Sequence, residues 1–335
     1  MPDGRARWLR PARPAVEGSA AARSGSMGAV GVKTTNDGEA FDRLCALVAA
    51  GGVAVVSGAG ISTDSGIPDY RGPNGALRRH TPMTYQQFTK EPGARHRYWA
   101  RSHAGWRQVA RAEPNAGHRA VARLEQAGLV TGIVTQNVDE LHQRAGSRHV
   151  IDLHGSLSRV VCSDCGEVSP RRDLDERLSA ANPGFHISGA PTNPDGDVTL
   201  SEEAVARFVM VDCRGCGGEQ LEPDVVFFGA TVPRPRVAQA FDLVESARAV
   251  MILGSSLTVM SGYRFVLRAA ELGIPVAIVN QGPTRGDSRA TVRVDAPLGS
   301  LLPRLAAAVT GGERTLGLSR TVPSLALSGD SPAEL

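Results

Sequence analysis

The chain has 335 residues, of which 41% are hydrophobic and 21% charged, and its formal net charge is +3. A chain of this length and balance buries a sizeable core, unlike a disordered protein with few apolar residues and a large net charge. The small net charge does not indicate a nucleic-acid-binding surface, and no apolar run approaches the roughly 18 residues that a membrane-spanning helix needs.

The two ends of the chain show no periodic apolar face. Residues 1–36 are rich in Arg, Ala, Pro, Gly and Ser and lack the apolar core of a secretory signal peptide. We interpret them as a disordered tail, with Met27 as an alternative start, and not as a mitochondrial presequence, because acidic residues and prolines interrupt the arginines. Residues 311–335 are rich in Ser and Pro and are also predicted to be disordered.

Between these tails, short β-branched segments alternate with helical patterns. The predicted strands are Val53–Ser57, Gly132–Thr135, Val150–Leu153, Asp224–Phe228, Val250–Leu253 and Pro275–Asn280. Helices are predicted around residues 39–50, 115–127, 235–246, 261–272 and 298–309, the first with Asp37 as its N-cap. The alternation predicts an α/β fold, a doubly wound Rossmann-like parallel sheet with ligands at the carboxyl ends of its strands.

Two segments interrupt this alternation. Residues 71–113 contain aromatic side chains that would anchor a small helical insertion, namely Tyr85, Phe88, Tyr98, Trp99 and Trp106. Residues 160–220 contain two cysteine pairs. We expect both segments to pack together as a smaller domain inserted into a core of residues 37–70, 114–159 and 221–310. A cleft between the two parts is the expected substrate site.

The cysteine pairs are Cys162/Cys165 and Cys213/Cys216, both of the form Cys-x-x-Cys. Two thiolates three residues apart hold one edge of a metal ion, and two such pairs complete a tetrahedral zinc site. Cysteine fills all four positions and leaves none for water, so the zinc is predicted to be structural. A redox dithiol or a chance pairing is the alternative. It is disfavoured because glycine follows each pair, as in tight metal-binding turns.

Cysteines without a disulfide framework indicate a reducing compartment. Lys33 and Lys90 are the only lysines among 37 basic residues, a bias typical of a GC-rich bacterial genome. A bacterial cytoplasm is therefore the expected location.

The strand Val53–Ser57 runs directly into Gly58-Ala59-Gly60-Ile61-Ser62. Glycines after a strand let the backbone approach a pyrophosphate, and a following helix offers free N–H groups. Thr63 stands where the dinucleotide fingerprint has its third glycine, and no acidic residue follows at the expected spacing. Alone, this motif leaves both a nucleotide site and an ordinary strand–helix turn open.

Six further tracts follow in chain order. They are Gly66–Gly72, Thr135–Asp139 with Leu141-His142, Leu153-His154-Gly155, Pro223–Gly229, Gly254-Ser255-Ser256 and Val279–Gly282. In this order the set resembles the sirtuin family over about residues 38–310. Residues 279–285 and 194–197 are most similar to its class II, mitochondrial-type branch. The resemblance implies a catalytic domain over residues 37–310 that uses NAD to deacylate lysines of acylated proteins or peptides, with one structural zinc.

In the chemistry that the resemblance implies, the acyl-lysine carbonyl oxygen attacks the anomeric carbon of the nicotinamide ribose, and nicotinamide leaves. His154 then activates a ribose hydroxyl as general base, since histidine titrates near neutrality. His142 is a weaker candidate that packs or caps. Asn137 would orient ribose hydroxyls or a water, and Asp139 would accept from the carboxamide; helix capping is the alternative for either.

The resemblance also implies further cofactor contacts. Tyr70, where relatives normally have phenylalanine, would shield the ribose, Arg71 would contact phosphate or ribose, and Asn280 would bind the adenine ribose. The complete implied set is Gly58, Ala59, Gly60, Ser62, Asp69, Tyr70, Arg71, Gln136, Asn137, Val138, Asp139, Gly254, Ser255, Ser256, Asn280, Gln281, Gly282 and Leu298.

The segment Val225–Gly229 resembles the strand that pairs with a substrate peptide, with Val226, Phe228 and Gly229 at the lysine channel. Ala230 replaces the acidic residue that usually follows. Desuccinylating relatives carry a tyrosine and an arginine close together in the helical insertion. Here Phe88 lies three positions after Tyr85, so we expect poor activity on succinyl-lysine.

Other functions use parts of the same pattern. A protein ADP-ribosyltransferase would use the same cofactor residues and stays open. A dehydrogenase is disfavoured by the incomplete fingerprint, and a zinc-ribbon binding module leaves His154 unexplained. We expect neither a membrane nor a specific nucleic acid as partner. The preferred acyl group, the target proteins and the oligomeric state are not readable from the sequence.

Overall fold

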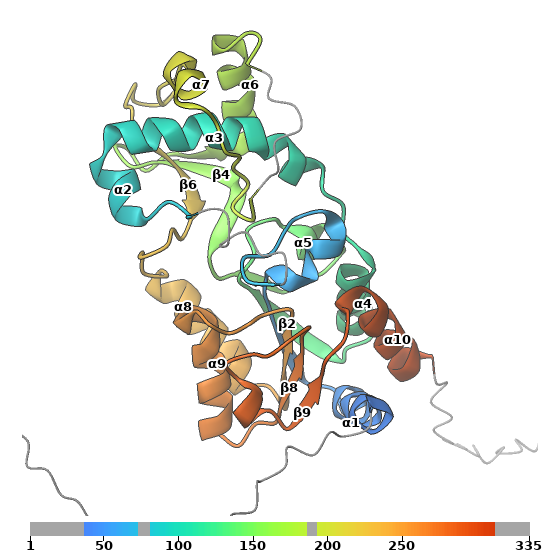
Figure 1. Ribbon diagram of the computed structural model, residues 1–335. Helices are drawn as coiled ribbons and strands as arrows, with labels where there is room; N and C mark the ends of the chain where they lie inside the picture. Colours follow the sequence, from blue (N-terminus) through green and yellow to red (C-terminus); the bar gives the residue numbers. More distant parts are fainter. Residues whose placement is uncertain (1–36, 73–80, 186–192, 312–335) are drawn as a thin grey trace, which may run out of the picture. The chain divides into compact units, whose positions relative to one another are not determined.

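Six parallel strands form the larger of two sheets in a computed structural model of the chain, which describes residues 37–72, 81–185 and 193–311 (Figure 1). The strand order is β3–β2–β1–β7–β8–β9. The bounds are β1 Val53–Ser57, β2 Val130–Thr135, β3 Val150–Asp152, β7 Ala249–Leu253, β8 Val276–Val279 and β9 Val292–Val294. All described residues belong to one compact unit. The two predicted disordered tails lie outside the described ranges except for Gly311.

Helices cover both faces of this sheet. Figure 1 shows α8 (Arg234–Glu245) and α9 (Met260–Glu271) on one side and α1 (Asp37–Ala49), α4 (Ala116–Gln126) and α10 (Leu298–Thr310) on the other. Val53 and Val55 of β1 point into the core shared with α1, α4 and α10, whereas Val56 points into the core shared with α8 and α9. This two-sided burial explains why the strands are almost continuously apolar. The doubly wound Rossmann-like fold and its five helices are confirmed. The predicted cap at Asp37 concerns a side chain that the structure does not describe.

The order of the strands places the site. The chain runs outward from β1 to β2 and β3, and later returns to β7 on the other side of β1. Because adjacent connections diverge there, a crevice is left at the carboxyl ends of β1 and β7. Short helices fill the loops around it: η1 Ala59–Ile61, η2 Thr63–Ser65 and α5 Leu141–Arg144, with η4 Asp287–Arg289 before β9.

A smaller domain is built from both interrupting segments. Its antiparallel sheet has the order β5–β4–β6, with β4 Gly155–Cys162, β5 Val168–Pro170 and β6 Leu221–Val225. Its helices are α2 Tyr85–Lys90, α3 Pro92–Arg111, α6 Arg171–Ala181 and α7 Glu202–Arg207. Trp99 of α3 is fully buried in the shared core, and its Nε1 donates to the Leu221 carbonyl oxygen at 2.9 Å. Side chains of the helical segment and of the cysteine-bearing segment share this core.

Some sequence predictions are wrong. The strand predicted at Asp224–Phe228 ends at Val225 and pairs with β4 in the small sheet, not with the parallel sheet. A short apolar run does not reveal its partner strand, which is why this assignment failed. β4 runs from Gly155 to Cys162 and so crosses residue 159, where the sequence analysis placed a domain boundary. Strands β4, β5 and β9 were not predicted, and Tyr85, expected as an anchor, is 43% exposed.

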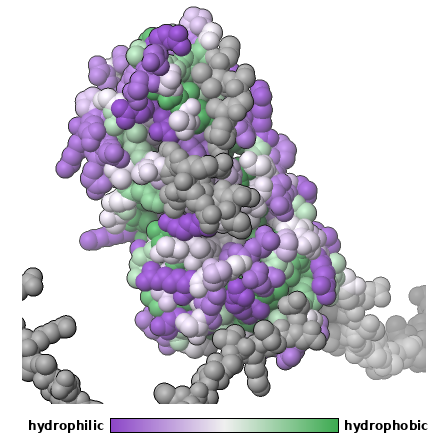
Figure 2. Space-filling view, viewed as in Figure 1, coloured by the Kyte–Doolittle hydropathy of each residue, from purple (hydrophilic) through white to green (hydrophobic). Residues whose placement is uncertain are grey.

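Hydrophilic side chains cover much of the described surface on the face drawn in Figure 2, as expected when the apolar residues fill internal cores. Among the described helices, none combines the length and the apolar character that crossing a membrane requires.

Candidate functional site

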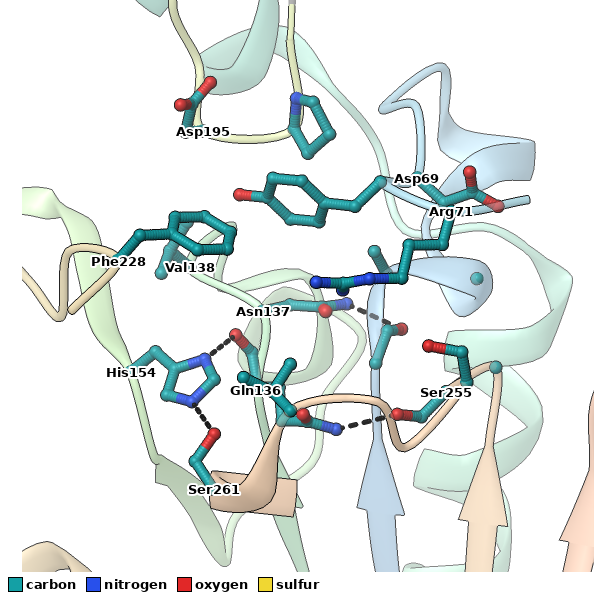
Figure 3. Close-up of a pocket in the computed structure, with 18 of the residues that line it drawn as sticks. Asp69, Arg71, Gln136, Asn137, Val138, His154, Asp195, Phe228, Ser255 and Ser261 are labelled. Atoms are coloured by element: carbon teal, nitrogen blue, oxygen red, sulfur yellow. Dashed lines mark hydrogen bonds between the residues drawn. The ribbon is translucent and has the colours of Figure 1, made fainter. Parts of the chain in front are cut away.

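A cavity of about 1030 Å³ lies at the carboxyl ends of β1, β2 and β7 and extends to residues of the small domain (Figure 3). Every predicted cofactor and peptide residue except Leu298 lines it, and so does His154. Leu298 begins α10, and its Cδ1 would lie 2.8 Å from a β-carbon added to Gly254. Leu298 thus supports the cavity floor from behind.

Glycines make this floor. A β-carbon on Gly60 would lie 2.8 Å from the Gly254 carbonyl oxygen, and one on Gly58 would lie 2.8 Å from Ser255 Cβ. The backbones after β1 and β7 therefore touch directly, and Gly60 N donates to Gly254 O at 2.9 Å. The absence of side chains at these points lets the two loops meet, so the cavity floor is a backbone cradle, which fits a diphosphate group that must approach the main chain closely.

A polar chain links the loops after β1 and β2. Asn137 Nδ2 donates to Gly58 O at 3.2 Å and to Ser62 Oγ at 3.0 Å, and Ser62 Oγ donates to Asp139 Oδ2 at 2.7 Å. Burial raises the pKa of the Asp139 carboxyl, against the opposing effect of hydrogen bonds from Leu141 N and Ser62. Both side chains thus have structural partners, and Arg71 extends into the cavity above Asn137 in the view of Figure 3.

His154 follows β3 and is held at both ring nitrogens. Its Nδ1 lies 2.9 Å from the Gln136 carbonyl oxygen and its Nε2 lies 2.9 Å from Ser261 Oγ (Figure 3). A carbonyl oxygen only accepts hydrogen bonds, so Nδ1 carries the proton and Nε2 presents its lone pair. Burial lowers the pKa of His154; the Gln136 hydrogen bond opposes this, and Arg264 and Arg236 add to the lowering. The imidazole is therefore neutral at neutral pH.

His142 is excluded as the base by its position. It is 1% exposed, does not line the cavity, and its Nε2 lies 2.9 Å from Ser57 Oγ. Burial lowers its pKa to about 3. Its ring packs edge-on against His118 at 5.0 Å between centroids. His142 thus fills the structural role that the sequence suggested for it.

The four cysteines come together in the small domain. Their sulfur atoms all lie within 4.8 Å of one another, with Cys162 and Cys216 at 3.7 Å and Cys165 and Cys213 at 3.8 Å. A tetrahedral zinc with Zn–S bonds of about 2.3 Å separates its sulfurs by roughly 3.8 Å. The donor set and its spacing fit such an ion. None of the four lines the cavity, which agrees with a structural role.

Comparison with known proteins decides the family, because the sequence matches the Sir2 family over residues 58–261. The chain belongs to the Sir2 family, the sirtuins. It is 61% identical over 257 residues to "NAD-dependent protein deacetylase 1" of Streptomyces coelicolor, covering 77% of this chain and 86% of that one. It is 54% identical to the protein of the same name from Mycobacterium avium, covering 78% and 93% of the two chains.

Solved structures agree with this assignment. One described as "Structural Basis for the Mechanism and Regulation of Sir2 Enzymes" has a TM-score of 0.66 and 31% identity, covering 82% of this chain and 98% of that chain. Another, described as "Sir2-p53 peptide-NAD+", has a TM-score of 0.64 and 29% identity, covering 81% and 98%. This sirtuin therefore shares the whole catalytic fold with them.

The small-domain end of the cavity shows which tyrosine of the helical insertion lines it. Neither Tyr85 nor Phe88 lines the cavity, whereas Tyr98 of α3 does. Arg101 lies three positions after Tyr98, but its NH2 pairs with Asp197 Oδ2 at 2.9 Å and its Nε donates to Val198 O at 2.8 Å. The sequence interpretation chose the wrong tyrosine because the path of the insertion is not readable from spacing. The Tyr-x-x-Arg pattern at residues 98–101 was the available signal.

Sequence reasoning also missed the start of α9. Val259, Met260, Ser261 and Arg264 all line the cavity beside His154. Val259 and Met260 are 39% and 48% exposed, so they form an apolar rim open to solvent. Their position just beyond Gly254-Ser255-Ser256 was the only signal, and it is indistinguishable from an ordinary helix start.

Proposed function

We propose that this sirtuin is an NAD-dependent protein-lysine deacylase that transfers the acyl group of lysine to ADP-ribose and releases nicotinamide. The observation that carries the proposal is the neutral His154, whose Nε2 lone pair points to Ser261 Oγ at the wall of a cavity with a glycine floor. The names of the bacterial relatives support the same function.

The residues present fit NAD. The backbone cradle at Gly58, Gly60 and Gly254 would hold the diphosphate, and Asn280 after β8 would contact the adenine ribose. Arg71 and Tyr70 would cover the nicotinamide ribose, with Asn137 and Asp139 below them. When bound, NAD supplies the ribose that receives the acyl group and the nicotinamide that leaves.

His154 would act as the general base of the acyl-transfer step. It accepts a proton at Nε2 while Gln136 O holds the Nδ1 proton in place and so stabilises the imidazolium that forms. Base catalysis of this kind contributes about 10²–10⁴-fold to the rate.

The substrate peptide would bind along the segment after β6. Val226, Phe228 and Gly229 line the cavity and would form one edge of the peptide groove, and the exposed Val259 and Met260 would form the other. The backbone of Phe228 is fixed to α2, because its carbonyl oxygen accepts a hydrogen bond from Tyr85 N at 2.9 Å. An extended acyl-lysine peptide lies between these two edges, with its side chain directed toward His154. Ala230 adds no charge to this groove, which favours a broad choice of peptide.

The acyl group would lie beyond Phe228, where Met83, Tyr98 and Asp195 line the cavity. This end carries an acidic side chain, and Arg101 is bound to Asp197 outside the lining. We therefore infer that acetyl and longer uncharged acyl groups are preferred over succinyl. The pattern at residues 194–197 and 279–285 supports placement near the class II branch.

We also infer a structural zinc at the cysteine cluster and a location in the cytoplasm of a bacterium. The tetrahedral spacing of the sulfurs supports the first inference. The bacterial relatives and the free cysteines support the second.

The test is mass spectrometry of acetyl-, lipoyl- and succinyl-lysine peptides incubated with the protein, with and without NAD. We expect NAD-dependent loss of the acyl mass together with nicotinamide and acyl-ADP-ribose. The His154→Ala variant should lose this activity, whereas His149→Ala, at a histidine whose side chain is 74% exposed, should retain it. NAD consumption with ADP-ribose added to a protein, and no deacylation, would instead establish the ADP-ribosyltransferase.

A further inference from the structure

Ser261 occupies the position from which His154 would take a proton. Its Oγ lies 2.9 Å from His154 Nε2, and because Nδ1 is protonated, the serine hydroxyl is the donor in this pair. A neutral imidazole has one lone pair, so Nε2 has no second position for a ribose hydroxyl. That hydroxyl either displaces Ser261 or passes its proton through it.

Both partners of this hydrogen bond are held in place. Gln136 fixes His154 through its carbonyl oxygen, and α9 packs on the same residue, since a β-carbon on Gly262 would lie 2.5 Å from Gln136 Oε1. Beyond Gly262, the buried residues Phe265 and Val266 anchor α9 in the core. The backbone of Ser261 is therefore fixed relative to His154, which favours relay over displacement.

The serine hydroxyl has the chemistry that a relay needs. It donates its one proton to Nε2 and retains oxygen lone pairs that accept another hydrogen bond. Ser261 lines the cavity together with His154, Met260 and Arg264 (Figure 3), so a ligand hydroxyl can reach it.

We propose that Ser261 relays the proton from the ribose hydroxyl to His154; this rests on the deacylase function proposed above. As the ribose hydroxyl gives its proton to Ser261 Oγ, the Ser261 proton moves to His154 Nε2. The O–H bond of the ribose breaks and leaves its electron pair for attack on the acyl carbon, while the serine hydroxyl is restored and the imidazole becomes imidazolium. No oxidant or reductant takes part.

The first measurement needs no NAD. His154 is titrated by NMR in the wild-type protein, Ser261→Ala and Ser261→Thr. A donor to Nε2 stabilises the neutral imidazole, so Ser261→Ala should raise the pKa of His154, and Ser261→Thr should keep it near the wild-type value. The charged groups acting on His154, Arg264 of α9 and Arg236 of α8, are unchanged in both variants. An unchanged pKa in Ser261→Ala would show that the hydrogen bond is absent in solution.

The second measurement separates the relay from a structural role. Deacylation should fall roughly 10- to 100-fold in Ser261→Ala, part of the usual contribution of a general base. Exchange of labelled nicotinamide into NAD precedes the base step and should continue. Ser246→Ala, at an exposed serine at the end of α8, is the matched control. Deacylation that stays the same or becomes faster in Ser261→Ala would overturn the relay in favour of displacement. An equal loss of exchange and deacylation would overturn it in favour of a structural role.

The third measurement uses the wild-type enzyme alone. Single-turnover deacylation is followed in mixtures of H2O and D2O. Two protons moving together give a quadratic dependence of the rate on the deuterium fraction, which we expect. A linear dependence means that one proton moves, and would contradict the relay. Failure of the proposed function looks different, because the wild-type protein would then show no NAD-dependent deacylation at all, whatever residue stands at position 261.

Discussion

His154 and Tyr98 are the two residues whose surroundings say most about the chemistry. Burial between Gln136 O and Ser261 Oγ makes His154 a neutral base with a defined tautomer. Tyr98 lines the cavity from the small domain, as does Asp195, and the acyl group would be recognised there. The sequence identified His154 because it follows a strand directly. It did not identify Tyr98 or Ser261 as site residues, because Tyr98 lies on α3 and Ser261 on α9. Both helices reach the cavity only through tertiary packing.

The pH dependence of deacylation should follow His154. Since its pKa is lowered, the neutral base persists below the usual histidine range, and activity is lost only as the pH falls through that lowered pKa. Arg264→Gln removes a cation that disfavours the imidazolium, so the acidic limb of kcat/KM should move to higher pH. Arg268→Gln, one turn further along α9 and paired with Glu245, is the control. If the acidic limb of kcat/KM stays at the same pH in Arg264→Gln, a group other than His154 controls it.

Asp195 should control the choice between acyl groups. A succinyl carboxylate near this side chain loses about 1–2 kcal/mol through like-charge repulsion in a partly buried site. Asp195→Asn should therefore raise the ratio of desuccinylation to deacetylation roughly 5- to 30-fold. The ratio is measured as kcat/KM on two peptides that differ only in the acyl group. No change in the ratio would place the acyl terminus elsewhere.

At the scale of elements, the pairing of β6 and the clustering of the cysteine pairs shape the small domain. β6 was expected in the parallel sheet, but its apolar pattern is compatible with either sheet, and it pairs with β4 instead. The cysteine pairs, by contrast, were readable, because two Cys-x-x-Cys pairs can surround one metal ion in a single tetrahedral arrangement. They tie the turn after β4 to the loop before β6.

Cys213→Ser should release the zinc and destabilise this element. The remaining three sulfurs would bind the ion more weakly than four. The small-domain core that includes Cys162, Cys213 and Leu221 would then lose the metal cross-link between its segments. We expect loss of bound metal by elemental analysis and a lower melting temperature of the small domain. Cys45→Ala, in α1, should keep the metal. A metal-free protein with unchanged melting temperature would contradict the structural role.

At the scale of the whole molecule, the site exists because two domains meet along β6. Asp224 of β6 accepts from Arg159 of β4 and from Arg236 of α8, both at 2.8 Å. One carboxylate therefore joins the small sheet to a helix of the parallel-sheet core. Val226 continues this join, since its N donates to His154 O at 2.8 Å.

Asp224→Asn should weaken the join between the domains without touching the NAD cradle. The partly exposed pairs contribute about 1 kcal/mol, which corresponds to roughly 2–4 °C in melting temperature. We expect a higher KM for the acyl-peptide, because Val226 and Phe228 follow directly, and an unchanged Kd for NAD by calorimetry. An equal loss of NAD affinity would show that the cradle depends on the same contacts.

The sequence by itself determined the doubly wound sheet, the four cysteines that cluster and nearly every residue that lines the floor of the cavity. These features are local: apolar runs, a fixed Cys-x-x-Cys spacing, and glycines and polar residues at strand ends. Parallel strands bring those ends to one edge without further information. Leu298 was predicted to contact the cofactor but does not line the cavity. It packs instead against the far side of the loop at Gly254.

Only the tertiary structure decided which strand belongs to which sheet, which tyrosine faces the acyl group and which hydroxyl holds His154. Each of these depends on packing between segments far apart in the chain, such as α9 against Gln136 or α3 against β6. Their sequences are ordinary helices and strands. Spacing along the chain carries no information about such contacts, because the distance between two helices is set by the core that lies between them.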